Sequence, residues 1–315
     1  MSAAAFQPPC HADLRLCLLK MCQFWQGKKL HADKYGRSDE LFVASCLQYN
    51  FQLVVFTDQT GRSLELSAHP RRIISCVPSQ TELLWDLGLE KEVIGITKFC
   101  VHPAHWRKQK VNIGGTKKLH LEKIVALAPD FILANKEENE QAQIEWLSSR
   151  FPTYISDVRD LTQAVNMIIT VGEITSKIEK ALQFSRTIDT MFHSSGRQET
   201  SVSACYLIWR APWMTINKDT FIHDMLNRLG FKNVFGDRKE SRYPTITDSE
   251  LIEANPQILF LSSEPFPFAE CHLKELQGLL PKTRLQLING EILSWYGSRL
   301  CRFDRAYFDD LRKQQ

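Results

Sequence analysis

The sequence predicts an α/β protein in which two Rossmann-like lobes, joined by a single long α-helix, enclose a ligand cleft. Three observations predict this class. Short apolar runs alternate with helical segments from residue 51 onward, a similar succession returns in the carboxyl half, and a proline-free helical stretch separates the halves. A chain of 315 residues also accommodates two hydrophobic cores. The predicted units are an N-terminal extension at 1–50 that we expect to be disordered, a first lobe at 51–175, a linking helix at 176–199 and a second lobe at 200–315.

The first half begins with a predicted hairpin, because two strand-like runs at 51–56 and 63–66 flank a turn that ends at Gly61. A buried strand follows at 73–77. Ser79 is then the predicted N-cap of a helix, since Glu82 three residues later completes a capping box. The next predicted elements are strands at 93–97 and 131–134 and, between them, a helix at 121–127.

The second half repeats this order. A strand is predicted at 205–209 and a helix at 221–229, and residues 249–260 resemble 121–133 in sequence. Between the halves, apolar residues recur with helical spacing from Ile178 to about Gly196, and a helix of that length is roughly 28 Å long at 1.5 Å per residue. We therefore expect a stiff connection between the lobes.

The composition is that of an ordinary globular protein, with 43% hydrophobic and 24% charged residues and a net charge of +3. Lysines and arginines do not cluster with aromatic residues, so we expect no nucleic-acid partner. The nine cysteines include no C-x-x-C pair, which favours packing thiols in a reducing compartment. Lys20 interrupts the apolar run at 14–25 and no small-residue cleavage site follows, so no signal peptide and no membrane span are predicted.

Catalytic motifs are missing from the sequence. There is no G-x-S-x-G or H-E-x-x-H motif, and the segment Gly114–Lys117 lacks the spacing of a phosphate-binding loop. We therefore expect a binding protein, neither an enzyme nor the holder of a catalytic cofactor.

Three features together resemble a known family: the segment 72–84 with its Pro-Ser-x-Thr-Glu-Leu motif, Gly114-Gly115 ahead of Leu121–Ile124, and the helical rod followed by a second lobe. They are similar to the class III periplasmic binding proteins, or helical-backbone metal receptors, which serve ABC importers of cobalamin, haem and ferric siderophores. The similarity covers about residues 51–315, and the segment 209–224 looks closest to cobalamin-receptor-like members. The resemblance implies a monomer that binds a small metal chelate and docks on an ABC importer permease.

Candidate site residues lie on the loops that follow the predicted strands, where open α/β sheets bind ligands. Large flat side chains on loops expose apolar surface unless something covers them, and a macrocycle would cover them while cations and hydrogen-bonding groups meet its polar edge. The alternative is that these aromatic rings pack the rims of their own lobe. The candidate ligand-binding residues are Ser79, Phe99, Trp209, Arg210, Trp213, Tyr243, Glu264, Trp295, Tyr296 and Arg299.

A metal role is a separate hypothesis for the loop that contains Cys100 and His102, because a thiolate and an imidazole are both axial ligands of cobalt or iron. The alternative is that His102, which precedes Pro103, hydrogen-bonds its own loop. Docking of the permease by one surface carboxylate per lobe is implied by the resemblance, and Glu137, Glu138 and Glu240 are candidates.

Two further functions stay open. The missing signal peptide and the free cysteines fit a cytoplasmic carrier or sensor of the same corrinoid or tetrapyrrole, whereas the resemblance implies the periplasm or cell envelope. An enzyme that modifies a corrinoid or tetrapyrrole would use Cys100, His102 or Glu264. The binding interpretation requires that Trp209 and Trp295 face the first lobe.

Overall fold

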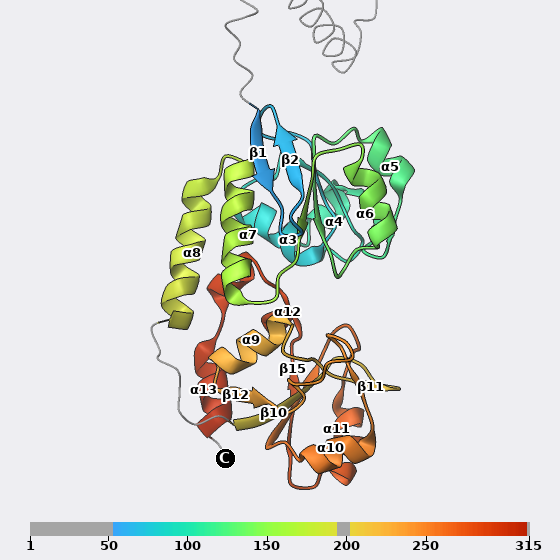
Figure 1. The fold of residues 1–315 in the computed structure, drawn as a ribbon, viewed down its shortest axis with the longest axis vertical. Coiled ribbons are helices and arrows are strands. Elements are labelled where there is room, and N and C mark those ends of the chain that lie inside the picture. The colour runs from blue at the N-terminus through green and yellow to red at the C-terminus, as the bar shows by residue number, and fades with distance from the viewer. Residues whose placement is uncertain (1–52, 194–201, 314–315) are drawn as a thin grey trace, which may run out of the picture. The chain divides into compact units, whose positions relative to one another are not determined.

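A computed structural model describes residues 53–193 and 202–313 (Figure 1). The predicted extension at 1–50 and the last residues of the predicted linking helix lie outside the described residues. No helix within the described ranges is both long and apolar enough to cross a membrane.

The first sheet has five parallel strands in the order β5-β4-β3-β8-β9. Its central strands are apolar runs whose residues are buried on both faces, as a parallel sheet covered by helices requires. The hairpin β1-β2 is antiparallel, as predicted. The strands are β1 (Val54–Thr57), β2 (Ser63–Leu66), β3 (Ile73–Ser75), β4 (Val93–Ile96), β5 (Val111–Asn112), β6 (Gly114–Gly115), β7 (Lys118–Leu119), β8 (Phe131–Asn135) and β9 (Thr153–Ser156).

The second sheet has four parallel strands in the order β12-β10-β14-β15. Strand β10 ends at Leu207, two residues before the predicted end, and Trp209 instead forms an isolated bridge with Met214. The strands are β10 (Val202–Leu207), β11 (Trp213–Met214), β12 (Phe231–Asn233), β13 (Thr245–Ile246), β14 (Ile258–Ser262) and β15 (Arg284–Ile288). Two parallel α/β sheets therefore confirm the predicted fold class.

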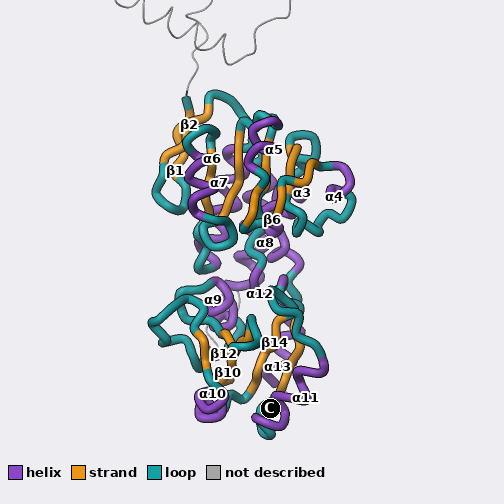
Figure 2. Tube along the Cα trace, turned by 90° about the vertical axis from the view of Figure 1, so that its right-hand side faces the viewer, coloured by secondary structure: helices purple, strands orange, loops and turns teal. Residues whose placement is uncertain are grey.

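Helices flank both sheets (Figure 2). In the first half they are α3 (Pro78–Asp86), α4 (Trp106–Gln109), α5 (Leu121–Ala126), α6 (Gln141–Ser148), α7 (Leu161–Ile174) and α8 (Ile178–His193). In the second half they are α9 (Phe221–Arg228), α10 (Asp248–Ala254), α11 (Glu270–Leu279), α12 (Glu291–Ser294), the 3₁₀ helix η1 (Ser298–Arg302) and α13 (Arg305–Lys313).

Two helix starts show how local sequence sets the boundaries. Helix α7 begins at Leu161 because the Asp160 side chain accepts a hydrogen bond from the Gln163 amide, 2.7 Å away. The capping box predicted for α3 is wrong. Its N-cap is Val77, which makes no side-chain cap, and Pro78 occupies the first turn, where its missing N–H costs nothing. Glu82 is consequently available for contacts with another part of the chain.

Helix α8 lies in sequence between the two sheets and packs along α7 (Figure 1). It also contacts η1, which belongs to the carboxyl half. One core cluster contains Leu83 and Phe131 from the first half together with Tyr206 and Phe260 from the second. Each half adds a cluster of its own on the other face of its sheet. The limits of the domains, including those of the linking helix, remain predictions.

Candidate ligand-binding site

Loops at the carboxyl ends of the strands of one lobe contact those of the other lobe. In a parallel sheet all strands end at one edge, so the loops after β3, β4, β8 and β9 gather there, as do those after β10, β14 and β15 in the second sheet. We call the residues that meet across the lobes the interlobe junction. They are Glu82, His102, Glu137, Asp157 and Arg159 from the first lobe, and Asp219, Arg242, Tyr243, Glu291, Trp295, Arg299 and Arg302 from the second.

The Glu82 carboxylate holds one side of the junction. Arg299 binds it through two nitrogens, at 2.8 and 3.0 Å, and Arg302 donates to it at 3.2 Å. Arg302 also reaches Asp86 at 2.7 Å. Arg299 continues to Glu291 at 3.0 Å. This network explains the position of Arg299, one of the predicted site residues, as a link between helix α3 and the carboxyl-terminal segment.

A second group of ion pairs across the junction is centred on Arg242. Its guanidinium contacts Glu137, Asp157 at 3.3 Å and Asp219 at 2.9 Å. Arg159 also contacts Asp157, at 2.8 Å, and Asp219, at 3.1 Å. Burial raises the pKa of Asp157, but the hydrogen bonds from Arg159 and Lys136 outweigh it, so the pKa falls to about 2. Asp157 is therefore ionised throughout the neutral range.

Tyr243 extends the Arg242 contacts. Its hydroxyl donates to Glu137 at 2.9 Å, so Glu137 receives hydrogen bonds from two neighbouring residues of the second lobe. Burial raises the pKa of the Tyr243 phenol, and the Glu137 charge raises it further. Tyr243 therefore stays neutral and acts as a donor.

His102 and Trp295 meet across the junction, and Glu264 lies beside Trp295. The His102 and Trp295 rings lie edge to face with centroids 5.6 Å apart, and His102 Nε2 lies 3.2 Å from the Glu291 carboxylate. The Trp295 indole donates to Glu264 at 2.8 Å. Trp295 is only 7% exposed, and its ring contact with His102 joins it to the first lobe. Trp209, which the binding interpretation also requires to face the first lobe, has its ring against Phe266 of its own lobe.

Ser79 of helix α3 and Tyr296, just before η1, lie where these two helices contact each other. Tyr296 is 6% exposed and Ser79 is 4% exposed. A Cβ atom added at Gly297, which follows Tyr296, would lie 3.3 Å from the Ser79 carbonyl oxygen. The hydroxyls of Ser79 and Ser298 are buried without a hydrogen-bond partner among the described residues. This part of the junction therefore holds polar groups that a ligand could satisfy.

Comparisons with known proteins identify the fold and its family. The family model for periplasmic binding proteins matches residues 73–280. The chain belongs to the periplasmic binding protein family. Among its relatives, a vitamin B12-binding protein of Pectobacterium carotovorum is 24% identical over 214 residues, which are 65% of this chain and 77% of that protein. An uncharacterised ABC transporter substrate-binding lipoprotein of Bacillus subtilis, YvrC, is 25% identical over 218 residues, or 65% of this chain and 68% of YvrC.

Solved structures agree with this periplasmic binding protein fold. The vitamin B12 binding protein BtuF of Vibrio cholerae matches with a TM-score of 0.63 at 18% identity, over 78% of this chain and 99% of BtuF. The iron uptake substrate-binding protein PiuA of Streptococcus pneumoniae matches with a TM-score of 0.67 at 18% identity, over 83% of this chain and 98% of PiuA. At these identities the likeness establishes the fold alone.

Several of the predicted site residues have partners within their own lobe. Arg210 forms a two-pronged ion pair with Glu275, at 2.8 and 2.9 Å. The Trp213 indole donates to Asp248 at 2.7 Å. Trp209 is 40% exposed, with its ring against Phe266. Phe99 is 51% exposed, in the first lobe. The rings of Trp209 and Phe99 are therefore accessible, whereas Arg210 and Trp213 have structural contacts.

The proposed metal ligands Cys100 and His102 have separate partners. The Cys100 thiol is fully buried and lies 3.0 Å from the Thr81 hydroxyl and 3.2 Å from that of Thr97, while His102 faces Glu291. Burial raises the pKa of Cys100, which favours the neutral thiol over the thiolate that binds metals. The described part of the chain contains no group of three or more His, Cys, Asp or Glu side chains placed to hold a metal ion.

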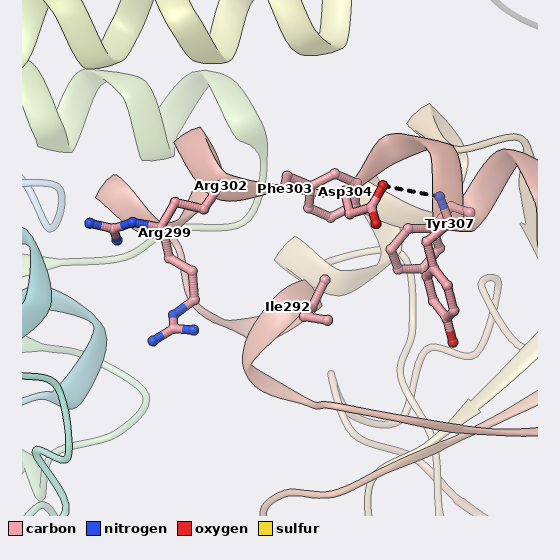
Figure 3. Close-up of a pocket in the computed structure, with 7 residues that line it drawn as sticks. Ile292, Arg299, Arg302, Phe303, Asp304 and Tyr307 are labelled. Carbon is pink, nitrogen blue, oxygen red and sulfur yellow. Dashed lines mark hydrogen bonds between the residues drawn. The ribbon is translucent and has the colours of Figure 1, made fainter.

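A cavity of about 290 Å³ lies beside the Glu82 network (Figure 3). Arg299 and Arg302 line it on the side away from Tyr307, and Ile292, Phe303, Asp304 and Phe308 complete the lining. Both arginines are committed to carboxylates, so the cavity offers a mainly apolar surface.

Sequence reasoning missed the charged partners of the junction. Arg242, Asp157 and Glu291 were not among the predicted site residues, and Glu137 was considered only as a docking carboxylate. Their one signal was position: each lies just after a strand or, like Arg242, directly before a predicted site residue. Charge pairing across the lobes depends on distances that the sequence does not contain.

Proposed function

We propose that this protein captures a metal chelate of the cobalamin, haem or ferric-siderophore group and presents it to an ABC importer permease, without catalysing a reaction. The observation that carries the proposal is the meeting of strand-end loops from both lobes at the interlobe junction, where Trp295 lies against His102. The relatives support this ligand group, because they include vitamin B12-binding proteins, and similar solved structures include haem- and siderophore-binding proteins.

The candidate ligand-binding residues belong to this proposal. Trp295, Tyr296, Tyr243, Glu264, Ser79 and Arg299 would contact the ligand where the lobes meet, and the accessible rings of Trp209 and Phe99 would cover its outer part. Junction contacts such as Tyr243–Glu137 would have to separate for a large macrocycle to enter.

Titration of the purified protein tests this function. Cyanocobalamin, haemin and a ferric hydroxamate siderophore are added separately while tryptophan fluorescence, ligand absorbance and melting temperature are recorded. One of them should quench the fluorescence and raise the melting temperature, because a ligand that binds only the folded state stabilises it. If none of the three changes any of these signals, the protein does not bind this group of ligands.

Two exposed tryptophans, Trp209 and Trp146, provide a matched pair of alanine variants. Trp209→Ala should weaken binding about tenfold, or about 1.4 kcal/mol, if its ring covers the ligand. Trp146→Ala is the control, since Trp146 is 37% exposed on helix α6 and stacks on Arg150. Equal affinities of the two variants would remove Trp209 from the site.

For the compartment we propose the cell envelope, as the lipoprotein name of YvrC suggests for that relative. The buried free thiols Cys76, Cys100 and Cys205 are equally compatible with a cytoplasmic carrier of the same ligand. Fractionation of native cells with detection of the full chain distinguishes the two locations. A purely cytosolic signal would favour the carrier and exclude delivery from the periplasm.

A further inference from the structure

The ring of Trp295 is contacted on three sides by side chains from both lobes. Its indole N–H donates to Glu264 at 2.8 Å, and the His102 ring lies edge to face with it at a centroid separation of 5.6 Å. The Arg299 guanidinium lies 4.8 Å from the ring centroid, within the range of a cation–π interaction. The residue is 7% exposed. The orientation of the ring is therefore set by Glu264, His102 and Arg299 together.

Glu291 holds two of these three neighbours. One oxygen of its carboxylate, Oε2, forms an ion pair with Arg299 Nη1 at 3.0 Å and lies 3.2 Å from His102 Nε2. Because an ionised carboxylate oxygen only accepts hydrogen bonds, the Nε2 atom of His102 is the donor in this contact. The Trp295 indole N–H is committed to Glu264, so the Glu291 side chain acts on the ring through His102 and Arg299.

Glu291 and its arginine partner are both held by further contacts. The Glu291 side chain is 18% exposed, and its backbone carbonyl accepts a hydrogen bond from the Trp295 amide at 3.1 Å. Glu82 binds Arg299 through two nitrogens, which fixes the plane of the guanidinium. Side chains that are fixed in this way hold a binding ring in one orientation before a ligand arrives, which lowers the entropy cost of ordering it on binding.

Both neighbours that Glu291 holds depend on the first lobe. His102 belongs to that lobe, and the guanidinium of Arg299 is fixed by Glu82 of helix α3. Separation of the lobes would therefore remove His102 from the Trp295 ring and release Arg299 from the Glu82 carboxylate. Contacts within the second lobe alone would then hold the ring, so its orientation depends on the contact between the lobes.

We propose that Glu291 is a positioning residue: through His102 and Arg299 it sets the orientation of the Trp295 ring, and it couples that orientation to the contact between the lobes. The inference rests on the proposed function, in which Trp295 contacts the captured chelate. Stacking between flat rings depends on their offset and angle. A Trp295 ring that is present but turned therefore binds a macrocycle more weakly, so Glu291 strengthens binding without contacting the ligand.

Fluorine NMR of the full chain labelled with fluorotryptophan tests the positioning role without any ligand. The Trp295 resonance is assigned by its disappearance in Trp295→Leu. Glu291→Ala should shift or broaden it, and so should Glu82→Gln, which acts from the first lobe. Glu291→Gln, whose amide oxygen still accepts a hydrogen bond, should restore the parent position. Glu90→Ala is the control, because it removes another carboxylate of the first lobe, 3.6 Å from His105, and should leave the resonance unchanged.

Affinities for cyanocobalamin and for haemin, measured separately by fluorescence titration, test the consequence for binding. Glu291→Ala should weaken binding of the captured macrocycle about fivefold, and Glu291→Gln should stay within about twofold of the parent. In a Trp295→Leu background, Glu291→Ala should have almost no further effect, because the residue acts through that ring. A carboxylate that contacted the ligand directly would keep its effect there. Circular dichroism and melting temperature verify that each variant is folded.

The outcomes separate the positioning role from the proposed function. If Glu291→Ala leaves the Trp295 resonance at its parent position, or weakens binding equally in the Trp295→Leu background, the positioning role is refuted and capture of a chelate stands. A resonance that Glu82→Gln does not move refutes the coupling to the first lobe. If neither macrocycle binds to the parent, the consequence for affinity is refuted, whereas a ferric siderophore that binds in the same assay leaves the proposed function standing.

Discussion

Strands β8 and β9 are neighbours in the first sheet, and the loops that follow them carry acidic residues whose pKa values are shifted in opposite directions. After β9, Asp157 meets three cationic side chains, from Lys136, Arg159 and Arg242. After β8, burial and the negative charges of Glu264 and Glu137 raise the pKa of Glu138, while the charge of Lys117 lowers it. The pKa of Asp157 falls to about 2, whereas that of Glu138 rises to about 8.

This difference separates two uses of a buried carboxylate. Removing a carboxylate from water is unfavourable unless cations and hydrogen bonds replace the water, and Asp157 has such replacements within the protein. Glu138 forms no ion pair among the described residues, so its partial burial disfavours the ionised state. A residue whose burial costs folding free energy is one for which a ligand can provide the compensation.

Removal of the shared cation should have the largest effect on this comparison. Arg242→Met leaves Glu137, Asp157 and Asp219 without their common partner, and we expect the free energy of unfolding to fall by about 2 kcal/mol. The value is at the low end for buried pairs because Asp219 is 44% exposed in its side chain and Asp157 retains Arg159 and Lys136. Urea denaturation at pH 7 measures it.

The control for this loss is Arg71→Met. The Arg71 side chain is 80% exposed and its nearest carboxylate, on Glu92, is 3.7 Å away, so the change should stay below about 0.5 kcal/mol. Equal losses in the two variants would mean that the cations around Asp157 do not stabilise the fold.

Neutralising Glu138 should raise the free energy of unfolding, whereas removing Arg242 lowers it. Because its pKa is raised on folding, the folded state is favoured when Glu138 is protonated, and this contribution is lost as the pH rises from about 4.5 through 8. Glu138→Gln should therefore gain stability relative to the unmodified chain as the pH rises through this range. Urea denaturation at pH 5, 6, 7 and 8 follows the difference.

Asp157→Asn sharpens the contrast with Glu138. The lowered pKa of Asp157 contributes stability that is present above about pH 4 and is lost as the pH falls towards 2. The asparagine variant should be less stable than the parent at pH 7, with the gap closing in acid. A variant pair that shows the same pH trend would contradict the assignment of opposite pKa shifts.

The sequence was sufficient for the fold because hydrophobic periodicity and repetition are local signals. The buried runs at β3 and β8 begin where strands were predicted, and β10 overlaps its predicted range, since strands buried on both faces must be short and apolar. The start of α3 was mispredicted because Ser79 and Glu82 have capping-box spacing. The box failed because the helix begins at Pro78, which places Ser79 inside its first turn, and Glu82 instead binds two arginines more than 200 residues away in sequence.

The site was predictable only by position along the chain. Strand-end loops led to Trp295, Tyr243 and Arg299, and each of these residues contacts the first lobe. Arg210 and Trp213 follow the same rule but pair with Glu275 and Asp248 in their own lobe. Side-chain partners at long sequence separation decide between these cases, and a single sequence does not encode them in any local pattern.

The smallest expected effect concerns Tyr243, which lies between the two regions. Tyr243→Phe removes one donor to Glu137 while Arg242 keeps the carboxylate paired, so we expect a loss of about 1 kcal/mol at pH 7. The double variant with Arg242→Met deprives Glu137 of both donors and places it in the situation of Glu138. Its loss should therefore exceed the sum of the single losses by about 1 kcal/mol, measured as the coupling energy of a double-mutant cycle in urea. Additive losses would show that Glu137 stays solvated without its partners, and the contrast between paired and unpaired carboxylates would then not extend to this residue.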